Sequence, residues 1–140
     1  MHEIVTAALV REGRVLLVHR NPDRRAYPDV WDLPGGHIET GETELVALAR
    51  EMHEELGVRI ATGSAIPLCR LDAGRGEESV HLSAWLVGEW EGTPANAAPD
   101  EHDEIRWFRP EELPPVAHEL IGTAIVKANL NALTVRAVES

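Results

Sequence analysis

The feature that most constrains this chain is a glycine-bounded acidic segment at residues 36–58, GHIETGETELVALAREMHEELGV. Its apolar residues recur at helical spacing, which predicts an amphipathic helix over residues 43–56 that buries one side. Thr43 has the chemistry of an N-cap, and Gly57 stands where a helix usually ends. The residues predicted to face the core are Leu45, Leu48, Ala49, Met52 and Leu56.

Three glutamates of the same helix are predicted to share one patch. Glu51, Glu54 and Glu55 are spaced i, i+3 and i+4, so their carboxylates converge beside the apolar stripe. Like charges at this spacing destabilise an isolated helix by roughly 0.2–0.5 kcal/mol per pair, so a compensating group is expected. Hard divalent cations such as Mg²⁺ prefer carboxylate oxygens and are shared with substrate phosphates. A solvated acidic helix face is the alternative interpretation.

The spacing across the whole segment is a more specific signal. Gly36, five residues, Glu42, seven residues and then REMHEELGV at 50–58 match the signature of the Nudix hydrolases at nine specified positions. The chain therefore resembles that family, with residues 36–58 as its Nudix box. The resemblance implies an α/β fold, a Nudix-type α/β/α sandwich with a mixed β-sheet between helices. It also implies metal-dependent hydrolysis of the diphosphate linkage in a nucleoside diphosphate linked to a further group X, with Mg²⁺ or Mn²⁺ as the cofactor.

The resemblance assigns roles to the residues of the box. It implies that Glu51 and Glu55 bind the metal, and that Glu54 is a further ligand or the base that activates water. Glu42 and Arg50 complete the expected catalytic set. Arg50 is the only Lys or Arg within the helix, and it can pair with Glu42 or orient Glu51.

Two further metal ligands are expected outside the helix. The first is the backbone carbonyl of Gly35, just before the box. The second is Glu101, because the segment EHDEIRWF at 101–108 resembles the part of MutT-like Nudix enzymes that brings one more carboxylate to the metal. Glu104 is the second choice for that carboxylate.

The charge of the chain restricts its partners. A formal net charge of −11 argues against tight non-specific binding to nucleic acid, whose affinity comes largely from neutralised phosphates. A polyphosphate substrate must still approach, so a local basic patch is expected just before the box. Arg20 is the best candidate for substrate binding there, followed by Arg24 and Arg25. The expected partner is a small-molecule nucleotide.

One residue of the C-terminal third is a candidate for contact with the nucleobase. His118, in LPPVAHELI, falls near the place where MutT-like proteins carry a polar side chain that meets the base. Members with firm oxidised-guanine specificity tend to carry Asn or Asp at that place. His118 departs from this pattern, which argues against a strictly oxidised-guanine enzyme.

A single domain over residues 1–140 is expected, because a chain of this length buries roughly two-thirds of its unfolded surface in one core. No apolar run approaches the ~20 residues of a membrane span. The single cysteine, Cys69, excludes an intramolecular disulfide. A cytoplasmic protein without a membrane partner is therefore expected, as a monomer or a homodimer.

Hydrophobic patterning predicts the remaining elements. Strands are expected at 3–10 and 14–19, joined as a hairpin across Glu12 and Gly13, and at 58–71, 79–90 and 105–108. A helical turn is expected at 110–113 and a helix at 117–133. This order places helices on both faces of a mixed sheet, as the resemblance implies.

The favoured substrate is a nucleoside triphosphate, ordinary or oxidised, that is cut to the monophosphate and pyrophosphate. The short chain and the MutT-like C-terminal third support this choice, and ADP-ribose or a nucleotide sugar is the close alternative. A non-catalytic nucleotide-binding Nudix module is disfavoured because Glu51, Glu54 and Glu55 are all present. An isopentenyl diphosphate isomerase-like enzyme is disfavoured because that chemistry requires a cysteine ahead of the box, and Cys69 follows it.

Overall fold

A mixed seven-stranded sheet forms the centre of the molecule in the computed structural model, which describes residues 1–130. Its main path runs β3-β2-β1-β7-β6, with β4 beside β1 and β9 beside β2. β1 and β7 are parallel, and the other pairs of the sheet are antiparallel. The strands are β1 (His2–Arg11), β2 (Arg14–Arg20), β3 (Trp31–Asp32), β4 (Gly35–His37), β6 (Ile66–Ala73), β7 (Val80–Val87) and β9 (His102–Phe108).

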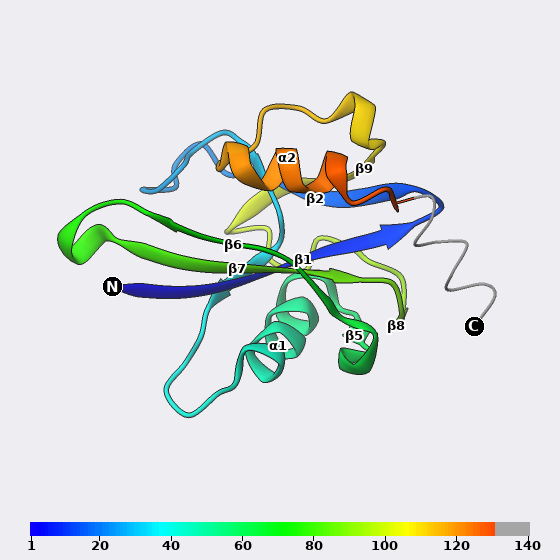
Figure 1. Cartoon of the computed structure of the whole chain (residues 1–140), viewed down its shortest axis with the longest axis horizontal. Coiled ribbons are helices and arrows are strands. Elements are labelled where there is room, and N and C mark those ends of the chain that lie inside the picture. The colour runs from blue at the N-terminus through cyan, green and yellow to red at the C-terminus, as the bar shows by residue number, and fades with distance from the viewer. Residues whose placement is uncertain (131–140) are drawn as a thin grey trace.

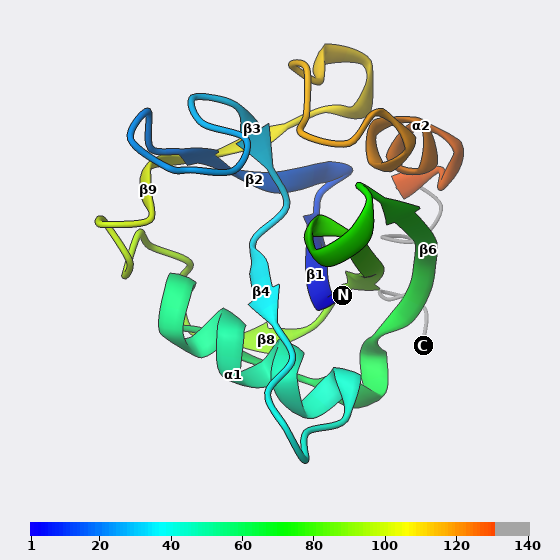
Figure 2. The same cartoon turned by 90° about the vertical axis from the view of Figure 1, so that its left-hand side faces the viewer.

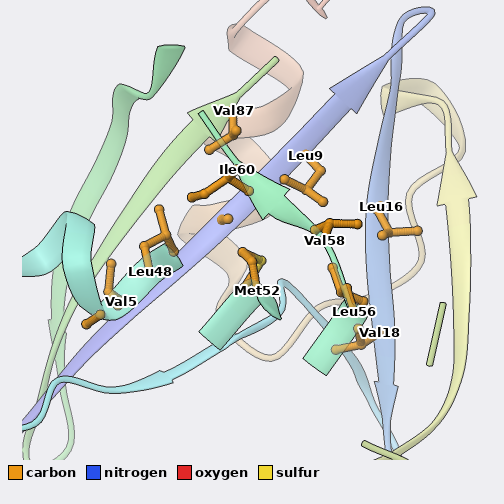
Figure 3. Packing of buried hydrophobic residues seen from close by; sticks show 12 residues of the cluster. Val5, Leu9, Leu16, Val18, Leu48, Met52, Leu56, Val58, Ile60 and Val87 are labelled. Atoms are coloured by element: carbon orange, nitrogen blue, oxygen red, sulfur yellow. The ribbon is translucent and has the colours of Figure 1, made fainter. Parts of the chain in front are cut away.

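Two helices cover opposite faces of this sheet, α1 (Glu44–Leu56) below it and α2 (Glu119–Lys127) above it in Figure 1. Alternate residues of β1 point to the two sides, as the two-residue period of a strand requires. Val5 and Leu9 pack with α1, whereas Ala8 and Val10 pack with α2. Figure 3 shows the α1 side, where Leu48, Met52 and Leu56 meet the strands. The predicted α/β/α sandwich with a mixed sheet is confirmed.

The ends of α1 follow from its sequence. The Thr43 hydroxyl accepts a hydrogen bond from the Val46 backbone N–H at 3.2 Å, which satisfies one of the free donors of the first turn. Gly57 ends the helix with a left-handed φ of 71°, and its N–H donates to the His53 carbonyl. The helix predicted over residues 43–56 is confirmed at both ends.

The other elements agree with prediction in part. The hairpin is confirmed by the pairs Val10↔Val15 and Arg11↔Arg14. The single β segments expected at 58–71 and 79–90 are wrong: each divides into a short strand and a long one. β5 (Arg59–Ile60) and β8 (Trp90–Glu91) pair with each other as a separate two-stranded sheet, and the 3-10 helix η1 (Thr62–Ser64) separates β5 from β6.

Further differences concern the shorter elements. β9 begins three residues earlier than the expected 105–108. The expected helix at 117–133 is confirmed over Glu119–Lys127, and its residues 131–133 lie outside the described part of the chain. The predicted helical turn at 110–113 is the 3-10 helix η3 (Pro110–Glu112), and η2 (Gly76–Glu78) lies between β6 and β7. β3 and β4 were not predicted, because two or three residues carry no alternating pattern.

Two loops meet beside the C-terminal half of α1, seen at the left of Figure 2. In the loop between β2 and β3, the Asn21 backbone N–H donates to the Glu101 carbonyl at 3.1 Å, and its side chain donates to the Pro99 carbonyl at 3.0 Å. In the loop between β8 and β9, the Ala97 N–H donates to the Glu55 carbonyl of α1 at 2.8 Å. These bonds bring residues distant in sequence to one edge of the sheet. No helix within residues 1–130 is long and apolar enough to cross a membrane.

Candidate active site

Arg50 connects the loop of the Nudix-type box with the acidic face of α1. Its guanidinium makes a bidentate pair with Glu42, Nε to Oε2 at 2.7 Å and Nη2 to Oε1 at 2.9 Å. Nη1 contacts Glu51 Oε1 at 3.0 Å and Glu54 Oε2 at 3.3 Å. Nη2 also donates to the His37 carbonyl at 3.1 Å. One cation therefore holds the loop and two of the three helix glutamates.

Glu42 anchors this arginine. Hydrogen bonds from Arg50 and from the Glu39 backbone N–H lower the pKa of Glu42 to about 2, so it stays ionised. The same pairing raises the pKa of Arg50 above its already high ordinary value. A planar guanidinium held at two points has little freedom, which also limits the carboxylates it contacts. Glu42 and Arg50 are therefore placed to position other groups.

Four carboxylates gather around the C-terminal half of α1. Burial raises the pKa of Glu55 well above its usual range, and the nearby carboxylates of Glu51 and Glu101 raise it further. Burial also raises the pKa of Glu101, with Glu51 and Glu54 adding to the effect and Arg24 opposing it. These mutual electrostatic effects show that the predicted Glu101 lies close to the helix glutamates, although it comes from a loop almost fifty residues away in the sequence.

Glu55 is the most buried of the group, with 5% of its side chain exposed. Its Oε2 has no hydrogen-bond partner, and its Oε1 lies 3.4 Å from Nε2 of His102, which is equally enclosed. Burial, together with Arg24 and Arg20, lowers the pKa of His102, so this imidazole is neutral. A buried carboxylate with an unsatisfied oxygen is unfavourable unless a cation or a proton compensates it.

The two glycines before the helix let the backbone approach these acids. A Cβ on Gly36 would lie 2.6 to 2.8 Å from the carboxylate atoms of Glu51, closer than side-chain contacts allow. Gly35 lies against β1, and its backbone N–H interacts with the Glu55 carboxylate. Gly35 therefore lies beside the buried Glu55, and the role of its carbonyl as a metal ligand stays a prediction.

The donor set suits a hard cation. The anionic side chains that converge, Glu51, Glu54, Glu55 and Glu101, are carboxylates, which match Mg²⁺ or Mn²⁺ and not the softer metals bound by thiolates. In the described residues 1–130, no three His, Cys, Asp or Glu side chains already surround a common point, and Arg50 is bonded to Glu51 and Glu54. A cation that retains water ligands and shares substrate oxygens needs fewer protein ligands than a closed cage.

Arg20 was predicted to bind the substrate, and in the structure its guanidinium donates to backbone carbonyls of its own loop. Its Nε donates to the Tyr27 carbonyl at 3.0 Å and its Nη2 to the Ala26 carbonyl at 2.8 Å, so the guanidinium holds the loop between β2 and β3. Arg24 donates from Nη1 to the Glu101 carbonyl at 3.1 Å. Of the predicted basic patch, these two arginines therefore act on the loops that border the acidic group.

His118 lies directly before α2 and does not cap it with its side chain. Its ring contacts Tyr27 edge to face, with centroids 4.7 Å apart. Burial and the positive charge of Arg20 lower the pKa of His118, so its imidazole is neutral. The structure thus brings His118 next to the loop held by Arg20.

A family model for the NUDIX domain matches residues 1–127. The chain belongs to the NUDIX family. The predicted resemblance is therefore confirmed, and the protein is a Nudix hydrolase. Nudix hydrolases generally use divalent metal ions, in agreement with the carboxylate-rich donor set.

Known Nudix proteins resemble this chain over most of their length. The CTP pyrophosphohydrolase of Escherichia coli (strain K12) is 34% identical over 113 residues, covering 80% of this chain and 78% of the relative. The 8-oxo-dGTP diphosphatase of the same strain is 26% identical over 122 residues, covering 86% and 93%. The crystal structure of a MutT NUDIX hydrolase from Burkholderia pseudomallei superposes with a TM-score of 0.80 at 30% identity, covering 91% of this chain and 97% of the other.

Two buried polar residues near the Nudix site were not predicted. His102 contacts Glu55, and Asp32 is 8% exposed with Oδ1 accepting from the Leu33 N–H at 2.8 Å. Burial raises the pKa of Asp32 to about 6, opposed by the Leu33 N–H and by Arg20. Each is an isolated polar residue in a short strand or at a strand start. The only signal in the sequence was the pair Glu101-His102 beside the predicted ligand.

Proposed function

We propose that this Nudix hydrolase cleaves a nucleoside triphosphate to the monophosphate and pyrophosphate with Mg²⁺ or Mn²⁺ as cofactor. The observation that carries the proposal is the convergence of Glu51, Glu54, Glu55 and Glu101 on one edge, with an unsatisfied oxygen on the buried Glu55. The protein would act on a small-molecule nucleotide.

In this proposal Glu51, Glu55, Glu101 and the Gly35 carbonyl hold the cation, and Glu54 is a further ligand or the base. A bound divalent cation supplies Lewis acidity at the phosphoryl oxygens. The buried position of Glu55 supports a ligand role, because its charge requires a partner. Arg50 and Glu42 would position Glu51 through their hydrogen bonds.

Glu54 is the favoured general base. Its side chain is 56% exposed, whereas Glu51 and Glu55 are enclosed, so solvent reaches it most easily. It would accept a proton from the attacking water as the new oxygen–phosphorus bond forms and the bridging bond to pyrophosphate breaks. Its single contact with Arg50, at 3.3 Å, leaves its other carboxylate oxygen free of that arginine.

The triphosphate assignment is supported by the relatives. The two named above act on CTP and on 8-oxo-dGTP, both of them nucleoside triphosphates. The relative named for CTP shares more identity with this chain, and His118 stands where oxidised-guanine enzymes tend to carry Asn or Asp. CTP and dCTP are therefore the first substrates to test.

The test combines variants with a substrate panel. Glu55→Gln and Glu54→Gln should each lower kcat by at least ~10²-fold, since each removes a charge that acts on the reacting groups. Glu89→Gln, a solvent-exposed acid between β7 and β8, is the matched control and should retain full activity. Circular dichroism checks that all three variants fold.

The panel contains CTP, dCTP, 8-oxo-dGTP, ADP-ribose and a nucleotide sugar, with the products identified by chromatography. Release of pyrophosphate and a monophosphate from a triphosphate supports the proposal. Preferred cleavage of ADP-ribose or of the nucleotide sugar contradicts the triphosphate assignment. Full activity in both the Glu54 and Glu55 variants, or activity that survives thorough chelation, contradicts the proposed centre.

A further inference from the structure

One buried histidine lies directly beside the carboxylate cluster. His102 begins β9, and only 2% of its side chain is exposed. Its Nε2 lies 3.4 Å from Oε1 of Glu55, whose side chain is 5% exposed. Within the described residues 1–130, neither ring nitrogen of His102 has a hydrogen-bond partner of good geometry. Buried nitrogens without firm partners are unfavourable for folding, so packing alone does not explain a histidine at this position.

The two carboxylate oxygens of Glu55 differ in their surroundings. Oε1 faces the imidazole of His102, whereas Oε2 is buried and makes no hydrogen bond within the described part of the chain. A carboxylate that binds a metal ion is itself held by a neighbouring polar group, which fixes its direction. His102 lies on the Oε1 side, so Oε2 is the oxygen that is left to bind a cation.

The charge of the ring suits this role. Burial, together with Arg24 and Arg20, lowers the pKa of His102, so the ring is neutral. A neutral imidazole can donate one hydrogen bond to a carboxylate oxygen, and it has no positive charge that would repel a cation on the other oxygen. Arg50, by contrast, brings a full positive charge to the carboxylates that it contacts.

The backbone of His102 fixes the neighbouring Glu101. The His102 N–H donates to the Ala98 carbonyl at 3.1 Å, and the Glu101 N–H donates to the same carbonyl at 2.9 Å. The His102 carbonyl accepts from the Asn96 side chain at 2.8 Å. Burial of the imidazole therefore anchors the short segment that carries Glu101.

We propose that His102 is a positioning residue of the metal site. Its ring holds Glu55 at Oε1 and leaves Oε2 for the cation, while its backbone holds Glu101 close by. The inference rests on the proposed function, because it concerns the metal ligands assigned there. His102 acts through these two glutamates and is not itself a ligand.

The test measures binding of Mn²⁺ alone to the full chain by electron paramagnetic resonance, without substrate. His102→Leu keeps a buried side chain of similar size without a nitrogen, and it should weaken Mn²⁺ binding by about 10-fold or more. His102→Gln places an amide N–H near the position of Nε2, and it should restore the affinity to within about 3-fold of the wild type.

A control separates positioning from general destabilisation. Ile125→Val removes one methyl group from the buried α2 side of the sheet, so it should lower the melting temperature and leave Mn²⁺ affinity unchanged. The metal-free His102→Leu variant should show the opposite, because it loses buried nitrogens that lack firm partners. If His102→Leu does not fold, His102→Asn replaces it, since its amide is too short to reach Glu55 and it should bind Mn²⁺ more weakly than His102→Gln.

The Mn²⁺ affinities decide the outcome. Weak binding in His102→Leu that recovers in His102→Gln supports the inference. Wild-type affinity in His102→Leu, or equal weakness in the leucine and glutamine variants, would overturn it. If the wild type hydrolyses no triphosphate but its Mn²⁺ binding still depends on His102, only the proposed function is contradicted.

Discussion

At the scale of single residues, Gly36 shows how closely the backbone of this enzyme approaches its acids. The peptide before α1 runs so near Glu51 that a methyl group on Gly36 would overlap the carboxylate. The φ angle of Gly36 is not among the positive values of the chain, so the requirement is for space and not for a left-handed conformation. The position of the Glu51 side chain therefore requires glycine at residue 36.

Gly36→Ala is expected to lower kcat/KM by at least about 10-fold while the melting temperature changes little. The added methyl must displace Glu51, and small displacements at a reacting centre reduce rates strongly. Gly88→Ala is the control, because nothing lies within 4 Å of a Cβ at that exposed glycine. Steady-state kinetics and thermal unfolding measure the two effects. Equal activity in both variants would mean that Glu51 adjusts freely.

Asp32 is a second residue whose surroundings matter, because burial changes the pKa of its carboxyl group. Its buried carboxyl has a pKa of about 6, raised from 3.8 by burial. Above a pH of about 4 the unfolded chain releases this proton, whereas the folded chain keeps it until a pH of about 6. The contribution of Asp32 to stability therefore decreases as the pH rises through this window, and it is constant above it.

Asp32→Asn should remove that decrease, because the amide does not ionise and its Oδ1 can still accept from Leu33. The free energy of unfolding of the wild type relative to the variant should fall by about 3 kcal/mol between about pH 4 and pH 6. Urea titrations of both proteins across the range measure the difference. Parallel pH dependences in the two proteins would contradict the raised pKa.

At the scale of elements, α1 depends on its two ends. Gly57 has a φ of 71°, and a Cβ at that position would meet nothing within 4 Å. The requirement for glycine is therefore a matter of backbone conformation alone. Gly63, in η1, has open space as well and no positive φ, which makes it a matched control.

Gly57→Ala should destabilise the protein by about 1–2 kcal/mol, because a left-handed conformation is unfavourable for a residue with a Cβ. Gly63→Ala should change stability by less than about 0.5 kcal/mol. Chemical denaturation at one pH measures both. If the two substitutions had the same effect, the end of α1 would not require glycine.

The elements also show which parts of the molecule were predictable. α1 was predicted closely because Thr43, its apolar stripe and Gly57 are local signals. β4 was missed because Gly35–His37 becomes a strand only through pairing with β1, far away in the sequence. Helical spacing predicted the shared patch of the three box glutamates, the resemblance added Glu101, and the structure brings them together. The contacts of His102 with Glu55, and of Arg20 with the loop carbonyls, arise from tertiary folding and leave no local pattern.

At the scale of the whole molecule, the two faces of the sheet share their strands. Val15 and Leu17 of β2 pack with α2, and Leu16 and Val18 pack with α1. Loss of either helix would expose alternate residues of the same strand. The two packed layers are therefore expected to unfold together.

We expect one cooperative transition, as the predicted single domain implies. Tryptophan fluorescence and far-ultraviolet circular dichroism should give the same denaturation midpoint, since Trp31 packs on the α2 side and Trp85, Trp90 and Trp107 on the α1 side. Separate midpoints would show that one helix layer is lost first. The measurement needs only the wild-type chain and a urea titration.

Arg50 holds Glu42 more firmly than it holds the glutamates of α1. Its double bond to Glu42 fixes the guanidinium, while a single nitrogen reaches both Glu51 and Glu54. The fold thus supplies its own counter-ion for two of its acids. In the proposed metal site, a cation at Glu51 and Glu54 would compete with this single nitrogen, and the two bonds to Glu42 would continue to hold the loop.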